Sequence, residues 1–185
     1  VAAVRVFANI VVSLIEFSDQ MLVVKAVTSA TTVEFARMRE VAKGLGATTR
    51  FTAAEAADGM AFLARAGFDV NEVISAIPAT LNLAAAAQLE LGNAADIASN
   101  LMTSFGRTTA ELPDIIDTLV FTANNANTTV QQLADGLKLF APIASQLGIS
   151  LKDASAAMAV LGDAGIQASL AGTGVRRVLT DLEAP

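Results

Sequence analysis

The sequence predicts an all-α protein, and three observations lead to that fold class. Hydrophobic residues make up 54% of the chain but aromatic residues only 5%, so the apolar mass is aliphatic and rich in Ala. Signals for helix starts alternate along the chain with glycines at which helices can end. No stretch combines apolar and polar alternation with an enrichment of β-branched residues. We therefore expect multiple Ala-rich helices of about 8–25 residues, separated by Gly-ended turns, and no sheet.

Helix starts are predicted where Ser, Thr, Asp or Asn precedes an acid or Gln by three residues, because the two side chains satisfy each other's free amides. In chain order these pairs are Thr31/Glu34, Thr52/Glu55, Asp69/Glu72, Asn93/Asp96, Thr129/Gln132 and Ser150/Asp153. Helix ends are predicted at glycine, which accepts the left-handed conformation after a last turn. The glycines concerned are Gly44 or Gly46, Gly67, Gly92, Gly106, Gly148 and Gly165.

Together these signals place ten helices, and three prolines qualify them. The predicted ranges are 2–28, 32–45, 53–66, 70–77, 79–89, 94–105, 112–124, 130–147, 151–163 and 168–183. The fourth and fifth ranges meet at Pro78. Pro113 should lie in a first turn, where its missing N–H does no harm. Pro142 falls inside a helical pattern and should kink or split that helix.

An internal similarity appears at an offset of 98 residues, between Phe51–Asp69 and Ile149–Gln167. The residues that recur are Ala56/Ala154, Met60/Met158, Ala61/Ala159, Leu63/Leu161, Ala66/Ala164 and Gly67/Gly165. Duplication explains this similarity, and so does convergence of two capped, Ala-rich helices. In either case we predict two similar helix-turn-helix units, 31–69 and 129–167, joined by a helical middle over 70–128. An N-terminal helix within 1–30 leads into this core region, 31–185.

The composition excludes several kinds of chemistry. The chain contains no His and no Cys, so it cannot build a Ser-His-Asp triad, a Cys-His dyad, a zinc finger, an iron–sulfur cluster, a His-ligated haem or a disulfide. Its net charge is -6, and four basic residues stand against twelve acidic ones between Phe51 and Val175. Binding to nucleic acid requires clustered Lys or Arg, so we expect no specific nucleic-acid partner.

Glycine and carboxylate motifs each have a structural explanation that we prefer to a functional one. Gly44-Leu-Gly46 and Gly172-Thr-Gly174 match part of a dinucleotide fingerprint, but neither follows a strand, so helix termination explains them better. Asp114 and Asp117 could form a metal or acid–base pair, yet both are expected in a first helical turn, where carboxylates favour the positive end of the dipole. The sequon Asn127-Thr-Thr129 reads as a helix start.

The basic residues also suggest no reactive site. Nothing in the sequence holds a lysine beside a serine; the lysines considered are Lys25, Lys43, Lys138 and Lys152. Exposed helix faces account for the basic pairs Arg37/Arg39 and Arg176/Arg177. We therefore predict no enzyme activity, no catalytic, cofactor-binding or metal-binding residue, and no cofactor.

Two apolar stretches bear on membranes and on the extent of the chain. Val1–Phe17 is interrupted by charged and polar residues, and Val73–Leu89 is short of the roughly 20 residues that a span takes. These stretches motivate an alternative function, that of a membrane-active helical protein that inserts to form a pore. Because the pattern is still helical close to Pro185, we expect this chain to be a piece of a longer protein.

Several long, ungapped runs resemble a known family. Particular marks are AGFDVNEV at Ala66–Val73, TLNLAAA at Thr80–Ala86, GNAADIASN at Gly92–Asn100 and LGDAGIQASLAGT at Leu161–Thr173. They resemble the core region of phage tail tape measure proteins of the TP901 family, over roughly residues 19 to 183. The sequence departs from the family at Ala79 and Ala86, where glycine is frequent, and in the stretch LPDIIDTLVFTANN.

The resemblance implies a structural role without catalytic residues. Such proteins act as a ruler and scaffold in the lumen of the tail tube, set tail length during assembly, and are ejected ahead of the DNA at infection. The implied partners are the tail tube protein, tail assembly chaperones and tail tip or baseplate hub proteins, with host membrane contact after ejection. Alanine-rich apolar faces need partners, so self-association as a trimer or hexamer is expected. The implied location is the virion, after assembly in the host cytoplasm.

Overall fold

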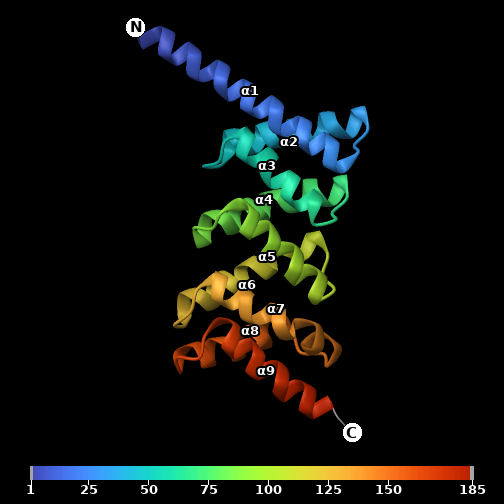
Figure 1. Ribbon diagram of the computed structural model, residues 1–185, viewed down its shortest axis with the longest axis vertical. Coiled ribbons are helices and arrows are strands. Elements are labelled where there is room, and N and C mark those ends of the chain that lie inside the picture. Colours follow the sequence, from blue (N-terminus) through green and yellow to red (C-terminus); the bar gives the residue numbers. More distant parts are fainter. Residues whose placement is uncertain (1, 184–185) are drawn as a thin grey trace. The chain divides into compact units, whose positions relative to one another are not determined.

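A computed structural model describes residues 2–183, and the side-chain surroundings of residues 11–182. The described residues form helices and no strand, which confirms the all-α fold class (Figure 1). The elements are α1 (Ala2–Thr28), α2 (Thr32–Thr48), α3 (Ala53–Arg65), α4 (Val70–Ala87), α5 (Leu91–Ser104), the 3-10 turn η1 (Thr109–Glu111), α6 (Leu112–Asn125), α7 (Val130–Gln146), α8 (Leu151–Asp163) and α9 (Ala168–Glu183).

The predicted break at Pro78 is wrong, because α4 runs through this residue as one helix. A proline inside a helix costs about 3 kcal/mol through the lost hydrogen bond and the ring clash. The ring of Pro78 is exposed, while buried apolar residues such as Val73, Ile77 and Leu81 lie on both sides of it. Full burial of each such side chain contributes about 1.5–3 kcal/mol, which outweighs the cost of the proline. For the same reason α7 is not split at the exposed Pro142, and Pro113 lies in the first turn of α6 as predicted.

Most predicted helix starts are confirmed by reciprocal hydrogen bonds. The Thr52 N–H donates to Glu55 Oε2 at 2.7 Å, and the Glu55 N–H donates to Thr52 Oγ1 at 3.1 Å. The same arrangement begins α2 at Thr31, α4 at Asp69 and α7 at Thr129, and Ser150 caps α8. The Asn93/Asp96 start is wrong, because α5 begins at Leu91, and the pair lies inside the helix.

The glycine predictions are right at four positions and wrong at three. Gly67, Gly106, Gly148 and Gly165 all have positive φ after a helix end. Gly44 and Gly46 instead lie inside α2, and a Cβ on Gly46 would be 2.5 Å from the Ala53 nitrogen, so close approach to α3 explains that glycine. Gly92 lies in the first turn of α5, and the left-handed residue after α4 is Gln88.

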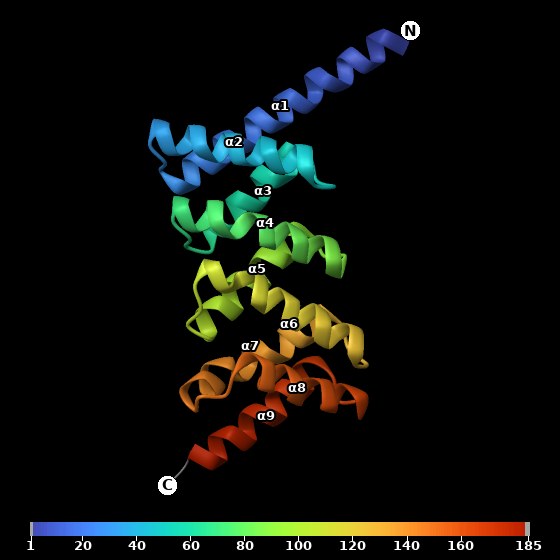
Figure 2. The ribbon, with the colours of Figure 1, turned by 180° about the vertical axis from the view of Figure 1, so that it is seen from behind.

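The chain divides into two compact units. Unit 1 comprises residues 1–85 and 90–95, and unit 2 comprises residues 86–89 and 96–185. In unit 1, α3 packs against both α1 and α2, and Met21, Met38, Met60 and Leu63 are fully buried. The first half of α1 extends beyond α2 and α3, as both views show (Figures 1 and 2).

Unit 2 is built around α7, which packs against α6, α8 and α9. Helices α7 and α9 cross closely, because a Cβ on Gly172 would lie 2.3 Å from the Gly136 carbonyl oxygen. Phe140, Leu133 and Leu119 are buried at the centre. Glycine is required at this crossing because only a bare Cα lets the two backbones approach so closely.

The two units follow the same 98-residue register over more helices than the sequence similarity covers. Three pairs of helices start 98 residues apart: α2 and α7, α3 and α8, and α4 and α9. The register extends to α1 and α6, whose buried residues Phe17 and Met21 correspond to Ile115 and Leu119. In the sequence, the boundary between the compact units falls at residues 86–95, inside the stretch 70–128 that is expected to link units 31–69 and 129–167. That division, with 1–30 leading into 31–185, stays a prediction.

Candidate functional site

A groove of about 770 Å³ lies between α6 and α8 in unit 2. Phe121 and Val160 on its rim are 70% and 69% exposed. Its lining residues are Asp114, Asp117, Thr118, Phe121, Thr122, Asn125, Ala126, Lys152, Ala156, Ala159 and Val160. The surface of the groove is thus mainly apolar, with two carboxylates and one ammonium group. This composition suits binding of another polypeptide better than catalysis.

The two carboxylates that the sequence singled out both line this groove. Asp114 lies in the first turn of α6, as expected, but Asp117 lies in the second turn, so the expectation that both cap the helix is wrong for Asp117. Both side chains are exposed, and Asp114 contributes its backbone carbonyl to the Thr118 hydroxyl at 2.8 Å. Within the part of the chain that the structure describes, no group of three acidic residues could hold a metal ion.

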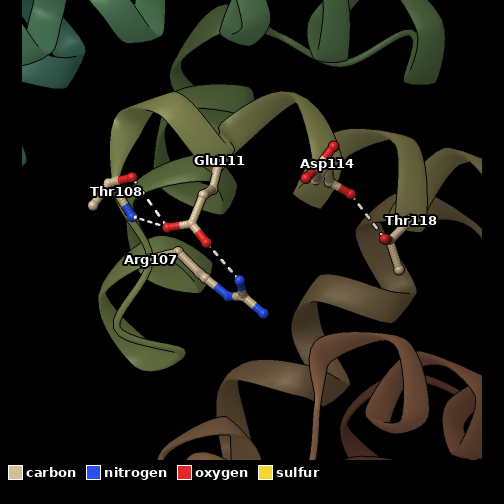
Figure 3. A network of polar contacts seen from close by, with 5 residues as sticks. All are labelled: Arg107, Thr108, Glu111, Asp114 and Thr118. Carbon is tan, nitrogen blue, oxygen red and sulfur yellow. Dashed lines mark hydrogen bonds and ion pairs between the residues drawn. The ribbon is translucent and has the colours of Figure 1, made fainter.

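The start of α6 carries a polar network that the sequence reasoning missed. The Glu111 carboxylate accepts hydrogen bonds from the Thr108 N–H and hydroxyl, both at 3.0 Å, and from Arg107 Nη1 (Figure 3). These bonds, the Thr108 N–H first and Arg107 next, lower the pKa of Glu111 to about 2. The signal was present, because Thr108 and Glu111 have the spacing of a capping box.

The other polar residues considered from the sequence are used in helix packing and capping. The Asn127 N–H donates to Asp163 Oδ1 at 2.7 Å, and Thr129 caps α7, so the sequon is a helix start as predicted. Gly172 and Gly174 lie inside α9, so helix termination is the wrong explanation for them. Ser150 and Lys152 line one small cavity, but the Ser150 hydroxyl donates to Asp153 Oδ2 at 2.6 Å as part of a helix cap.

The basic residues considered from the sequence are exposed or contact acidic, amide or aromatic side chains. Arg37 Nη1 donates to Asn71 Oδ1 at 3.2 Å, and Arg39 lies over the ring of Phe17. Arg176 and Arg177 are exposed on α9. Of the remaining lysines, Lys25 lies over the ring of Phe35, whereas Lys43 and Lys138 pair with Glu40 and Asp135.

One described helix, α4, is long and apolar enough to cross a membrane by length and composition. Its side chains also have another use, because Val73, Ile77, Leu81 and Leu83 belong to the buried core. A core helix passes the same test as a spanning helix, so the composition of α4 does not decide between the two roles.

These features define a class of protein, an all-α interaction module. Its described polar side chains cap helices and join them to one another, and its exposed groove suits a protein partner. The match to known proteins agrees with this class. The model of the phage-related minor tail protein family matches residues 39–185, and the chain belongs to that family.

Two curated relatives narrow the comparison. The tape measure protein of Pneumococcus phage Dp-1 is 36% identical over 170 residues, which is 92% of this chain and 15% of that relative. The probable tape measure protein of Escherichia phage P2 is 34% identical over 152 residues, or 82% of this chain and 19% of that relative. The chain thus spans under a fifth of the length of these relatives. No solved structure matches it.

Proposed function

We propose that this chain is a segment of a tail tape measure protein, which acts as a ruler and scaffold in the lumen of the phage tail. The observation that carries the proposal is the similarity to two tape measure proteins over 92% and 82% of the chain. Within residues 2–183 the chain forms helices joined by turns, which suits a ruler, because an α-helix advances about 1.5 Å per residue and length then encodes distance. Assignment to the TP901 family within this group stays a prediction.

The proposed partners follow from the role. A ruler in the lumen contacts the tail tube protein along its length, assembly chaperones before the tube closes, and tip or baseplate hub proteins at one end. The acidic balance of the chain, with a net charge of -6, suits a protein that leaves the tube ahead of the DNA without binding it. The proposed location is the virion tail, after assembly in the host cytoplasm.

Self-association as a trimer or hexamer is part of this proposal. Val12, Leu14 and Ile15 are 52%, 61% and 55% exposed on the extended first half of α1. Clustered exposed aliphatic side chains are characteristic of interaction surfaces. Light scattering on the purified chain should give three or six times the monomer mass of 19.0 kDa. A monomer at every concentration would contradict this part of the proposal.

The ruler hypothesis is tested by shortening or lengthening the chain by 98 residues, the offset between equivalent helices of the two units. Deletion of residues 32–129 removes 98 residues and joins Thr31 to Val130, so a Thr still caps the helix that follows. An extended helical ruler then predicts tails shorter by about 150 Å in electron micrographs. Duplication of the same residues should lengthen tails by the same amount, and Val33→Ala, at full length, should leave them unchanged. Unchanged tail length in both the deletion and the duplication would contradict the ruler.

A membrane-active role is the second candidate, and the exposed aliphatic residues on α1 are the observation that favours it. A chain that inserts by this surface should release dye from anionic liposomes, and Leu14→Asp together with Ile15→Asp should abolish the release. A matched Val33→Asp change, on the exposed face of α2, should have no effect. Intact liposomes in the presence of the unmodified chain would count against insertion by this segment.

A further inference from the structure

Positions 98 residues apart are equivalent in the two units, so unit 1 shows how a surface that is exposed in unit 2 can be covered. In unit 1, the chain that follows α4 makes a three-residue turn and returns as α5. The Gly92 backbone in the first turn of α5 lies against Phe62 of α3, because a Cβ built on Gly92 would be 3.1 Å from the Phe62 ring atoms. Ala94 and Ala95, one turn further on, are fully buried. The start of α5 therefore covers part of α3 in unit 1.

In unit 2, the surface that corresponds to this covered part of unit 1 is exposed to solvent. Val160 of α8 occupies the register position of Phe62 and is 69% exposed. On α9, Val178 and Leu182 are 58% and 74% exposed, whereas their counterparts on α4, Thr80 and Ala84, are fully buried. On α9, apolar side chains thus stand exposed in unit 2 at positions that are fully buried in unit 1, and on α8 an exposed Val takes the place of the partly buried Phe62. We define Val178, Leu182 and Val160, which also lines the α6/α8 groove, as the α8/α9 face.

We propose that the α8/α9 face is covered by polypeptide that follows residue 185 in the full-length protein, and that this segment returns as a helix of the same kind as α5. The occupant is identified by the template in unit 1, where the covering segment is a helix start with Gly against the aromatic ring and two buried Ala. The curated relatives supply the necessary length, since the chain spans 15% and 19% of them. Each four-helix unit would then be completed by the start of the helix that follows it in the chain, as Glu90–Ala95 completes unit 1.

This inference goes beyond the ruler, because it specifies which segment of the chain completes a helical unit, whatever length the chain measures. In unit 1 a small residue is needed at the helix start, since a side chain in place of Gly92 would meet the Phe62 ring beneath it. Burial of three aliphatic side chains supplies the driving force for docking. A segment tethered at the end of α9 also docks at a high effective concentration, so no large interface is required.

The test uses the absence of cysteine from the chain. A Val160→Cys variant has a single thiol, and its rate of modification by a soluble maleimide reports how exposed α8 is. A second copy of residues Gln88–Ser104 is appended directly after Pro185, which keeps the 98-residue register. We expect the appended segment to slow modification of the thiol at least tenfold, and to slow that of a Leu182→Cys variant as well.

Three controls make the result specific. The change Gly92→Gln, made only in the appended copy, should restore fast modification, because the side chain blocks close approach. A Val33→Cys variant, exposed on α2 in unit 1, should react at the same rate with and without the appended segment. An appended segment of scrambled sequence should give no protection.

Equal rates with the native and scrambled segments would overturn the proposal. So would protection that appears without any appended segment and grows with protein concentration, because a second copy of the chain would then be the occupant. Folding of every variant is checked by its helical circular dichroism. Tail length is not a readout here, so failure of this proposal is distinguishable from failure of the ruler.

Discussion

Helices α3 and α8 have the same length and the same kind of ends, yet α3 is enclosed and α8 is not. Each has 13 residues, a hydroxyl N-cap and a left-handed glycine after its last turn. Met60 and Met158, which correspond in the register, are both buried. Leu63 is fully buried, however, whereas its counterpart Leu161 is only half-buried. Helix limits are thus set by local chemistry, but enclosure is set by which other helices pack against the same face.

The difference in enclosure between α3 and α8 should have its largest effect on the free energy of unfolding when Leu63 or Leu161 is truncated. Leu63→Ala should lower the free energy of unfolding by about 3 kcal/mol, because it removes a fully enclosed side chain and leaves a cavity. Leu161→Ala should cost about half as much, since part of that side chain is already in water. Urea unfolding gives both values, with hydrogen exchange assigning each change to its unit. Equal costs would show that α8 is as enclosed as α3.

The next effect concerns the crossing of α7 and α9 at Gly136 and Gly172. These glycines have no counterpart in unit 1, because Met38 and Ile74 occupy the corresponding positions 98 residues earlier. Gly172→Ala should destabilise unit 2 by about 2 kcal/mol, because the new Cβ would overlap the Gly136 carbonyl. Gly174→Ala is the matched control in the same helix, with open space around it. That change should stabilise α9 by about 0.5–1 kcal/mol through helix propensity. Thermal unfolding of both variants tests the contrast, and destabilisation by Gly174→Ala would contradict it.

The fold was predictable from the sequence where each signal is local. Capping pairs such as Thr52/Glu55 determine a helix start through bonds within four residues, so pattern and structure agree. Pro78 shows the limit of this reasoning, because whether a proline breaks a helix depends on the apolar residues buried around it in three dimensions. The same holds for Gly46 and Gly172, which are required by backbones distant in sequence.

The groove was less predictable than the fold. Asp114 and Asp117 were identified in advance as a pair, but their position on a groove depends on how α6 packs against α8. The exposure of Phe121 had no signal, since an aromatic residue in an apolar helical pattern is expected in the core. The Thr108/Glu111 network, in contrast, had a clear local signal.

The smallest expected effect compares the caps at Glu34 in unit 1 and Glu111 in unit 2. Both carboxylates accept hydrogen bonds from a capping Thr, which lowers the pKa of each. Glu111 also accepts a hydrogen bond from Arg107, whereas the nearby Arg37 donates to Asn71 rather than to Glu34. We therefore expect carbon NMR titration to place the pKa of Glu111 near 2 and to find the pKa of Glu34 below its ordinary value.

The comparison also determines the pH dependence of the two caps. A pKa that is lower in the folded than in the unfolded chain stabilises the fold above the unfolded pKa, and this contribution is lost as the pH falls from about 4.5 to about 2. Arg107→Gln should raise the pKa of Glu111 and narrow this pH window, while Arg37→Gln should change the pKa of Glu34 little, because Thr31 is the main cause of its shift. If Arg107→Gln left the pKa of Glu111 unchanged, the Thr108 bonds alone would account for the shift, and the two caps would differ for another reason.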